Sequence, residues 1–157
     1  MGKVRGFIEY ERVNEKNVPV LIRNPDSTRP WQHVLEPLSG YLELAKLIYL
    51  KKDNLSLCSS FNFGPKIESN KSVKSLLEEI FKHWPGEWTN DKKLMQYHES
   101  KILNLQIDKA YNFLGWEPKW NFYETIEKTT NWYKKTIEGS IHPLEMCIED
   151  IRCFMSK

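Results

Sequence analysis

The sequence lacks features that mark several common classes of protein. Only three of its 157 residues are cysteines, without metal-ligand spacing, which fits free thiols in a reducing cytosol better than a disulfide framework. No apolar run approaches the roughly 20 residues of a membrane-spanning helix, and the first residues are too polar for a signal peptide. The net charge of +2 provides no strong basic field for nucleic acid. We therefore expect a cytoplasmic protein that binds neither membranes nor nucleic acids.

Motifs for dinucleotide binding and catalysis are also missing. The chain contains no Gly-x-Gly-x-x-Gly, no P-loop and no nucleophile elbow. Its four histidines show no paired spacing for a metal. Tyr97 and Lys101 form a Tyr-x-x-x-Lys pattern, but they follow a turn and precede a strand-like run, whereas the catalytic version needs a helix. We expect no catalytic residue, no metal site and no cofactor bound by this chain alone.

Hydrophobic residues make up 40% of the chain and aromatic residues 13%, enough for one folded domain spanning residues 1–157. Apolar periodicity predicts helices near residues 4–14, 38–49, 73–84, 108–114, 122–138 and 142–157. Short strands are predicted at residues 20–22, 60–63 and 102–107. The fold class is therefore α/β, with helices and few short strands, too few for a complete doubly wound sheet.

Local signals fix several helix ends. Ser72 and Asp108 are predicted N-caps, and Asn121 with Glu124 forms a predicted capping box. Gly115 is a predicted C-cap, and Gly139 is predicted to end the helix before it. In the helix after Pro37 the apolar positions form one stripe, which predicts its buried face: Leu38, Tyr41, Leu42, Ala45, Ile48 and Tyr49.

Arg29 is the most informative side chain. It stands between Thr28 and Pro30, and proline biases the residue before it toward an extended backbone. A guanidinium held in this way presents a planar fork of donors that suits a phosphate or diphosphate better than lysine does. The alternative is a surface arginine that leans on Trp31. Spacing alone does not separate these two interpretations.

Several segments together resemble the C-terminal half of CDP-glucose 4,6-dehydratases, members of the extended short-chain dehydrogenase/reductase group. They are Ile22-Arg23-Asn24-Pro25, the run from Thr28 to Leu42, Phe61-Asn62-Phe63-Gly64-Pro65, His98-Glu99-Ser100 and Leu114-Gly115-Trp116-Glu117-Pro118. The Arg-Pro-Trp-Gln-His-Val-Leu-Glu-Pro-Leu-Ser-Gly-Tyr run is specific to this dehydratase type. The sequence departs from the family pattern at Gln106, where an aspartate is common, and at Asp108, where a serine is common.

The resemblance implies that the full enzyme binds NAD in an N-terminal Rossmann half and dehydrates CDP-glucose to CDP-4-keto-6-deoxyglucose for polysaccharide biosynthesis. It implies that Arg29 meets the diphosphate, and that the other substrate-binding residues are Arg23, Asn24, Gln32, His33, His98 and Glu99. This chain would then be a substrate-binding fragment, inactive alone, with CDP-glucose or CDP as ligand and a separate Rossmann half or a homo-oligomer as partner. The alternative is a non-catalytic structural remnant that associates with itself or a partner subunit.

Overall fold

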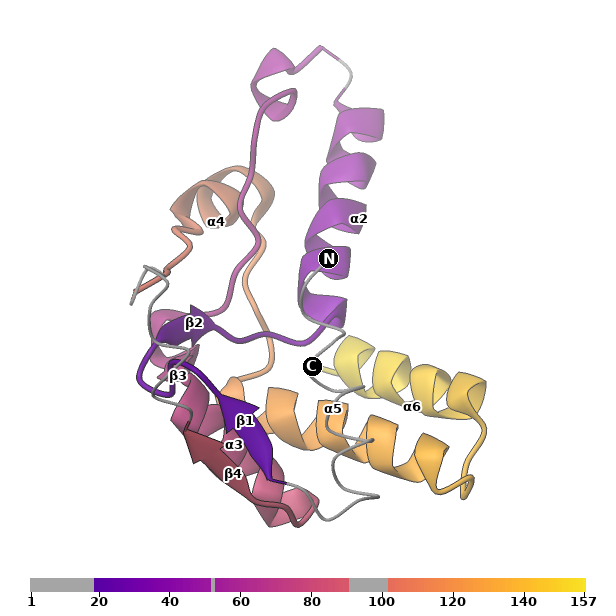
Figure 1. The fold of residues 1–157 in the computed structure, drawn as a ribbon. Helices are drawn as coiled ribbons and strands as arrows, with labels where there is room; N and C mark the ends of the chain where they lie inside the picture. The colour runs from indigo at the N-terminus through magenta and orange to yellow at the C-terminus, as the bar shows by residue number, and fades with distance from the viewer. Residues whose placement is uncertain (1–18, 52, 91–101) are drawn as a thin grey trace.

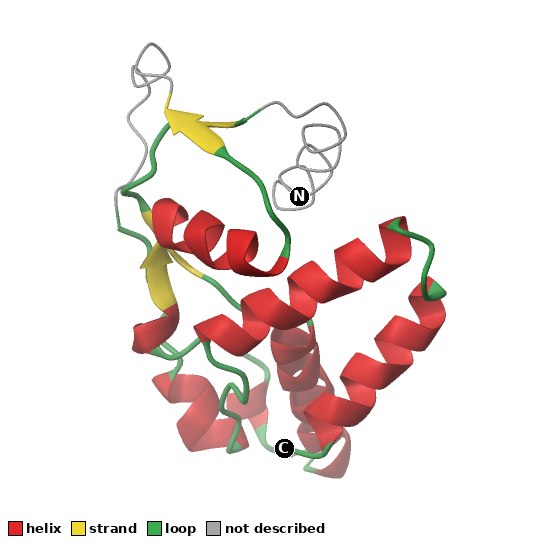
Figure 2. Ribbon diagram, turned by 90° about the horizontal axis from the view of Figure 1, so that it is seen from below, coloured by secondary structure: helices red, strands yellow, loops and turns green. Residues whose placement is uncertain are grey.

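The computed structural model describes residues 19–51, 53–90 and 102–157. Within these ranges lie strands β1 (Val20–Ile22), β2 (Thr28–Pro30), β3 (Asn70–Ser72) and β4 (Trp88–Asn90), the 3₁₀ turns η1 (Leu55–Leu57) and η2 (Ile67–Ser69), and helices α2 (Leu35–Leu50), α3 (Val73–His83), α4 (Asp108–Leu114), α5 (Phe122–Ile137) and α6 (Pro143–Met155). Helices dominate, as Figure 2 shows, and the α/β prediction with few short strands is confirmed. None of the described helices is both long and apolar enough to span a bilayer.

The strands form two separate two-stranded sheets. β1 pairs in parallel with β4, and Val20 lies opposite Trp88. β2 pairs in antiparallel fashion with β3, so that Thr28, Arg29 and Pro30 lie opposite Ser72, Lys71 and Asn70. The second pair joins the segment that begins the dehydratase-like motif to the segment that begins α3.

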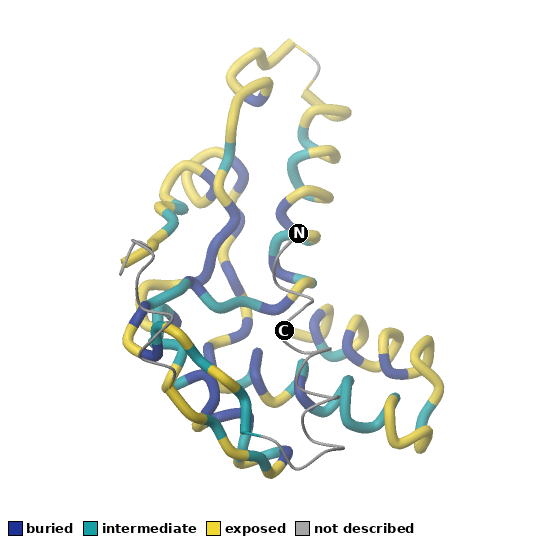
Figure 3. The backbone as a smooth tube through the Cα atoms, in the orientation of Figure 1, coloured by how far each residue is buried: buried dark blue, intermediate teal, exposed yellow. Residues whose placement is uncertain are grey.

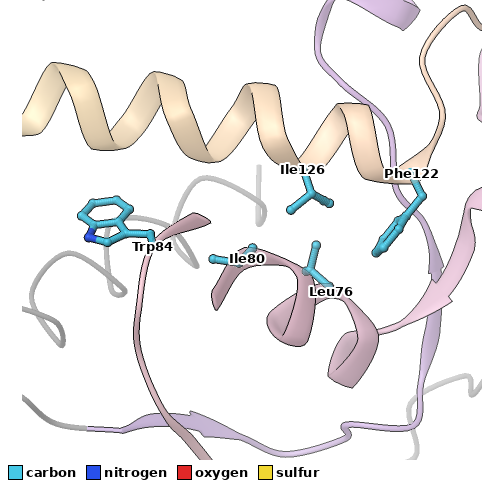
Figure 4. Close-up of a cluster of buried hydrophobic side chains, with 5 residues drawn as sticks. All are labelled: Leu76, Ile80, Trp84, Phe122 and Ile126. Atoms are coloured by element: carbon cyan, nitrogen blue, oxygen red, sulfur yellow. The ribbon is translucent and has the colours of Figure 1, made fainter. Parts of the chain in front are cut away.

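Two hydrophobic clusters hold the described part of the chain together. The first lies between α3 and α5 and consists of Leu76, Ile80, Trp84, Phe122 and Ile126 (Figure 4). The second lies beside α2 and α4 and consists of Leu57, Phe63, Ala110, Leu114 and Trp116. In Figure 1, α2 and α4 rise on one side of the molecule, while α3, α5 and α6 form the other. The segment between β2 and α2 runs from one cluster to the other.

The predicted helix signals for α3 and α5 are confirmed. The Ser72 side chain accepts a hydrogen bond from the Ser75 N–H. Asn121 and Glu124 form both bonds of the capping box at the start of α5. Gly139 follows this helix with a φ of 67°, in the left-handed region that glycine adopts most readily.

The ends of α4 agree with the prediction only in part. Gly115 is the left-handed C-cap, as expected. The prediction that Asp108 caps the helix is wrong, because Asp108 is the first helical residue and Ile107 stands at the N-cap. The Asp108 carboxylate instead accepts a hydrogen bond from the Gln106 side-chain amide.

The predicted buried face of α2 is wrong. Leu42 is 73% exposed and Tyr49 72%, and Leu38, Tyr41 and Ile48 of the same stripe are exposed as well. Figure 3 shows the exposed residues along α2. The inward face instead carries Glu36 and Gly40, which are buried, with Leu44 and Leu47 packed against the second cluster. Contacts at the start of the helix therefore orient it, rather than its apolar stripe.

Two predicted strands are also wrong. Residues 60–66 and 102–107 contain no strand, although contacts at Asn62 and Gly64 bring the two segments close together. Side chains take the carbonyl groups that a strand ladder would use. Asn62 donates to the Gln106 carbonyl, Asn70 to the Leu103 carbonyl and Gln32 to the Phe63 carbonyl. Because these bonds satisfy the backbone one group at a time, no continuous ladder is needed.

Candidate functional site

The site is built on the turn after β1 and on strand β2. The Ser27 N–H donates to the Asn24 carbonyl across the turn. β2 then places Arg29 in an extended backbone, as proline at position 30 predicts. The half-buried Arg29 guanidinium donates to the Thr28 carbonyl at 2.7 Å.

Lys71 lies directly opposite Arg29 on β3. Side chains directly opposite one another in an antiparallel pair stand on the same face of the sheet, with their Cβ atoms about 5 Å apart. The β2–β3 pair therefore brings two cationic side chains from distant parts of the sequence to one surface. Trp31 fixes this arrangement, because its indole N–H donates to the Lys71 carbonyl at 2.9 Å and its ring packs against the first cluster.

Gln32 and His33 form the corner between β2 and α2. The Gln32 amide donates to the Phe63 carbonyl at 2.9 Å, while its Oε1 is buried without a hydrogen-bond partner in the described ranges. His33 is 7% exposed, and its Nδ1 accepts the Leu35 N–H. Burial, aided by the charge of Lys128, lowers the pKa of His33 to about 4. His33 is therefore neutral at pH 7 and accepts a hydrogen bond from the N–H of Leu35, the first residue of α2.

Glu36 anchors the start of α2. It has no exposed surface, and its carboxylate accepts the Trp120 N–H at 2.7 Å and the Lys119 N–H at 3.1 Å. Burial raises the pKa of Glu36, although these two N–H groups and the nearby lysines act in the opposite direction. The carboxylate thus ties the helix after the Arg29 strand to the segment just before α5.

The segment Ser39-Gly40 fits against Phe63 and Trp116. The Trp116 indole donates to the Ser39 hydroxyl at 2.8 Å, and the Phe63 ring stands edge-on to Trp116 with a centroid distance of 5.0 Å. A Cβ atom added to Gly40 would lie 2.2 Å from Phe63 Cδ1. This close approach explains why glycine follows serine at this point of the motif.

Two of the open hollows in the part of the chain that the structure describes are defined by their lining residues. One, of about 530 Å³, lies between residues 65–68 and 104–108. The other, of about 460 Å³, lies at the end of α2 beside Leu50, Lys51, Asp53 and Asn54. Neither is lined by a described residue that was predicted to bind substrate. Among the described residues, no group of three or more His, Cys, Asp or Glu side chains could hold a metal ion.

No protein-family profile matches the chain. It is, however, 40% identical over 140 residues to CDP-glucose 4,6-dehydratase of Salmonella typhimurium. The predicted resemblance is confirmed. The match covers 88% of this chain but only 38% of the relative, in a C-terminal part of it. The chain is thus related to part of a sugar-nucleotide dehydratase and spans less than two fifths of that relative's length.

Within this dehydratase-like segment the structure places five of the seven predicted binding residues. Arg23 is exposed at the end of β1, and Asn24 begins the turn that leads to β2. Arg29, Gln32 and His33 follow within ten residues along the strand and corner. The remaining two, His98 and Glu99, lie outside the described residues, as do Tyr97, Lys101 and the predicted opening helix. Ligand contact by each of the seven stays a prediction.

The sequence alone did not indicate Lys71 as a candidate binding residue or Glu36 as an anchor of α2. Lys71 has no motif of its own, and only the β2–β3 pairing brings it opposite Arg29. Glu36 did carry a signal, since a carboxylate in the first turn of a helix beside Pro37 suits backbone N–H groups. Its partners, however, lie 83 and 84 residues away, at Lys119 and Trp120.

Proposed function

We propose that this chain is the substrate-binding C-terminal part of a CDP-glucose 4,6-dehydratase-like protein. The observation that carries the proposal is the likeness to the Salmonella dehydratase together with the placement of its most specific motif, which puts Arg29 opposite Lys71. A bound diphosphate would bridge the two cationic side chains, because charge-assisted bonds from a guanidinium fork to phosphate oxygens are strong.

The chain's own groups would bind and position the nucleotide rather than perform chemistry. Arg29 and Lys71 hold the diphosphate, while Arg23 and Asn24 stand at the turn beside the strand. In the full protein implied by the resemblance, NAD supplies the hydride chemistry from a Rossmann half. This chain has no Gly-x-Gly-x-x-Gly loop with which to bind it. We therefore propose that the chain alone shows no dehydratase turnover.

The exposed apolar stripe of α2 supports the proposal that a second domain or chain packs against this one. Its members are 40% to 73% exposed, and they gather on one side of the helix: Leu38, Tyr41, Leu42, Ile48 and Tyr49. A contiguous apolar patch of this kind is a typical interaction surface. We propose that a dinucleotide-binding half, either in the same polypeptide or supplied as a separate chain, covers this stripe in the working protein.

Isothermal titration with CDP-glucose and CDP tests the proposal. We expect binding to the chain alone, or to the chain mixed with the Rossmann half of the Salmonella dehydratase. Arg29→Ala and Lys71→Ala should each weaken it at least about tenfold, whereas the exposed control Lys46→Ala should not. Absence of heat both with and without the added half contradicts substrate binding. Formation of a 4-keto product by the chain with NAD alone contradicts the claim that it is inactive.

The same exposed surfaces favour a second candidate, a non-catalytic protein that associates with itself or with a partner subunit. Light scattering and binding of a hydrophobic dye separate the two candidates when combined with the titration. Association without any CDP or CDP-glucose binding supports the second candidate. Nucleotide binding that depends on Arg29 supports the first.

A further inference from the structure

Helix α6 is apolar on two opposite faces. Its inner face packs on α5 and contains Met146, Asp150 and Phe154, which are 3%, 4% and 7% exposed. Lys128 of α5 satisfies the buried Asp150 carboxylate at 3.5 Å. The opposite face carries four large apolar side chains that are 39% to 75% exposed: Leu144, Ile148, Ile151 and Met155. Figure 1 shows α6 at the edge of the molecule, with α5 as its neighbour.

The spacing of the exposed residues is that of a two-helix seam. Steps of four, three and four residues separate them along α6. These are the d, a, d and a positions of a heptad repeat, the pattern by which two helices bury a shared apolar stripe. Since the inner face of α6 already packs against α5, the outer stripe is not needed for the core of this chain.

A second copy of α6 in antiparallel orientation fits this stripe. Antiparallel pairing of helices places a positions opposite d positions, so Leu144 meets Met155 and Ile148 meets Ile151 of the other copy. In the same register Glu145, which flanks Leu144, comes beside Arg152 of the second copy. A two-fold axis repeats each of these contacts, so the seam and its charges are self-complementary. Glu145 and Arg152 are both exposed.

We propose that the outer face of α6, formed by Leu144, Ile148, Ile151 and Met155 with Glu145 and Arg152 beside it, joins two copies of this chain by antiparallel helix pairing. The 13-residue helix is about 20 Å long. The interface is therefore smaller than that of an obligate dimer, and we expect a concentration-dependent dimer of micromolar affinity. The proposal does not depend on nucleotide binding.

Sedimentation equilibrium of the full 157-residue chain, in reducing agent because Cys58 and Cys147 are exposed, tests the pairing. Ile151→Glu puts a carboxylate into both central layers and should raise the dimer dissociation constant about 100-fold or more. Leu55→Glu, at a position in η1 that is 80% exposed, is the matched control and should leave the dimer unchanged. A wild-type chain that stays monomeric at about 0.5 mM overturns the proposal. So does a dimer that is lost in Leu42→Glu, on the exposed stripe of α2, but kept in Ile151→Glu.

Charge reversal tests the orientation of the pair. E145R and R152E should each weaken the dimer roughly tenfold, because each sets like charges against each other twice. The double variant E145R/R152E restores opposite charges and should recover the wild-type dissociation constant. In a parallel pair these two side chains are far apart, so failure of the double variant to recover overturns the antiparallel register. Should Ile151→Glu not fold by circular dichroism, Leu144→Glu at the start of the helix replaces it.

Discussion

Replacing His33 by glutamine tests whether the corner between β2 and α2 is held by a buried neutral imidazole. His33 is 7% exposed, accepts the Leu35 N–H and stands edge-on to Trp120 with a centroid distance of 4.7 Å. Glutamine can accept the same bond through its side-chain oxygen but does not titrate. The substitution therefore removes the ionisation at this position while it retains a hydrogen-bond acceptor.

The size of the expected change in the free energy of unfolding follows from the pKa of His33. Burial, with a smaller contribution from Lys128, lowers the pKa of His33 from 6.5 to about 4. Since the folded pKa is depressed, the unfolded chain binds the proton more tightly. The contribution of neutral His33 to stability is fully present above pH 6.5 and is lost as pH falls through 4. A gap of about 2.5 pH units corresponds to about 3 kcal/mol.

Urea denaturation at pH 7 and at pH 4 measures this contribution. Between these two values the free energy of unfolding of the wild-type chain should fall by about 3 kcal/mol more than that of His33→Gln. The control is His142→Gln, which alters a second histidine whose Nδ1 accepts the N–H two residues further on, at the exposed start of α6, and leaves His33 in place. If His33→Gln loses as much stability on acidification as the wild type does, the buried neutral imidazole is refuted.

Substitutions at Glu36 and Gly40 test the packing of α2. Glu36→Ala should cost about 2–4 kcal/mol in the free energy of unfolding, because it leaves the buried N–H groups of Lys119 and Trp120 unpaired. Burial raises the pKa of Glu36, so the contribution of this side chain to the free energy of unfolding is largest below pH 4.5 and falls as the pH rises. In urea denaturation, the stability of Glu36→Gln relative to the wild type should therefore increase between pH 4 and pH 7. Gly40→Ala should lower the free energy of unfolding, measured by thermal denaturation, by about 1–3 kcal/mol, because the added Cβ would clash with the Phe63 ring. Combining it with Phe63→Leu should restore part of this loss. A stabilising Gly40→Ala, the result expected from helix propensity alone, contradicts the close approach.

Several helix ends were predictable because their signals are local. The caps at Ser72, Asn121 and Gly115, and the left-handed Gly139 after α5, involve partners within a few residues, and all four stand where the sequence placed them. The same holds for β1 at residues 20–22, which a short apolar run and a following turn signal define.

The orientation of α2 was not predictable from its periodicity. An apolar stripe shows which residues share a face, but not what covers that face. Glu36 and Gly40 point inward because of contacts with Trp120 and Phe63, which lie far away in the sequence. Three-residue strands such as β3 and β4 are likewise set by their partners rather than by a pattern of their own.

Part of the candidate site could be read from the sequence. The extended backbone of Arg29 follows from Pro30, and the likeness to the dehydratase follows from the motif around it. The opposing Lys71 could not be found, because strand register depends on tertiary structure. His33 matched the same motif, yet the structure buries it beside the start of α2, where it accepts the Leu35 N–H.

The measurement that most directly tests the substrate-binding account is the ratio of the dissociation constants for CMP and CDP, by isothermal titration, in wild type and Arg29→Ala. It is made with the chain alone and with the Rossmann half of the Salmonella dehydratase added. The two ligands differ by one phosphate, the group assigned to Arg29 and Lys71. The account predicts that wild type binds CDP at least about tenfold more tightly than CMP, and that Arg29→Ala reduces this preference while Lys71 retains part of it. Equal affinity of the wild type for both nucleotides, or a preference for CDP that Arg29→Ala leaves unchanged, would contradict it.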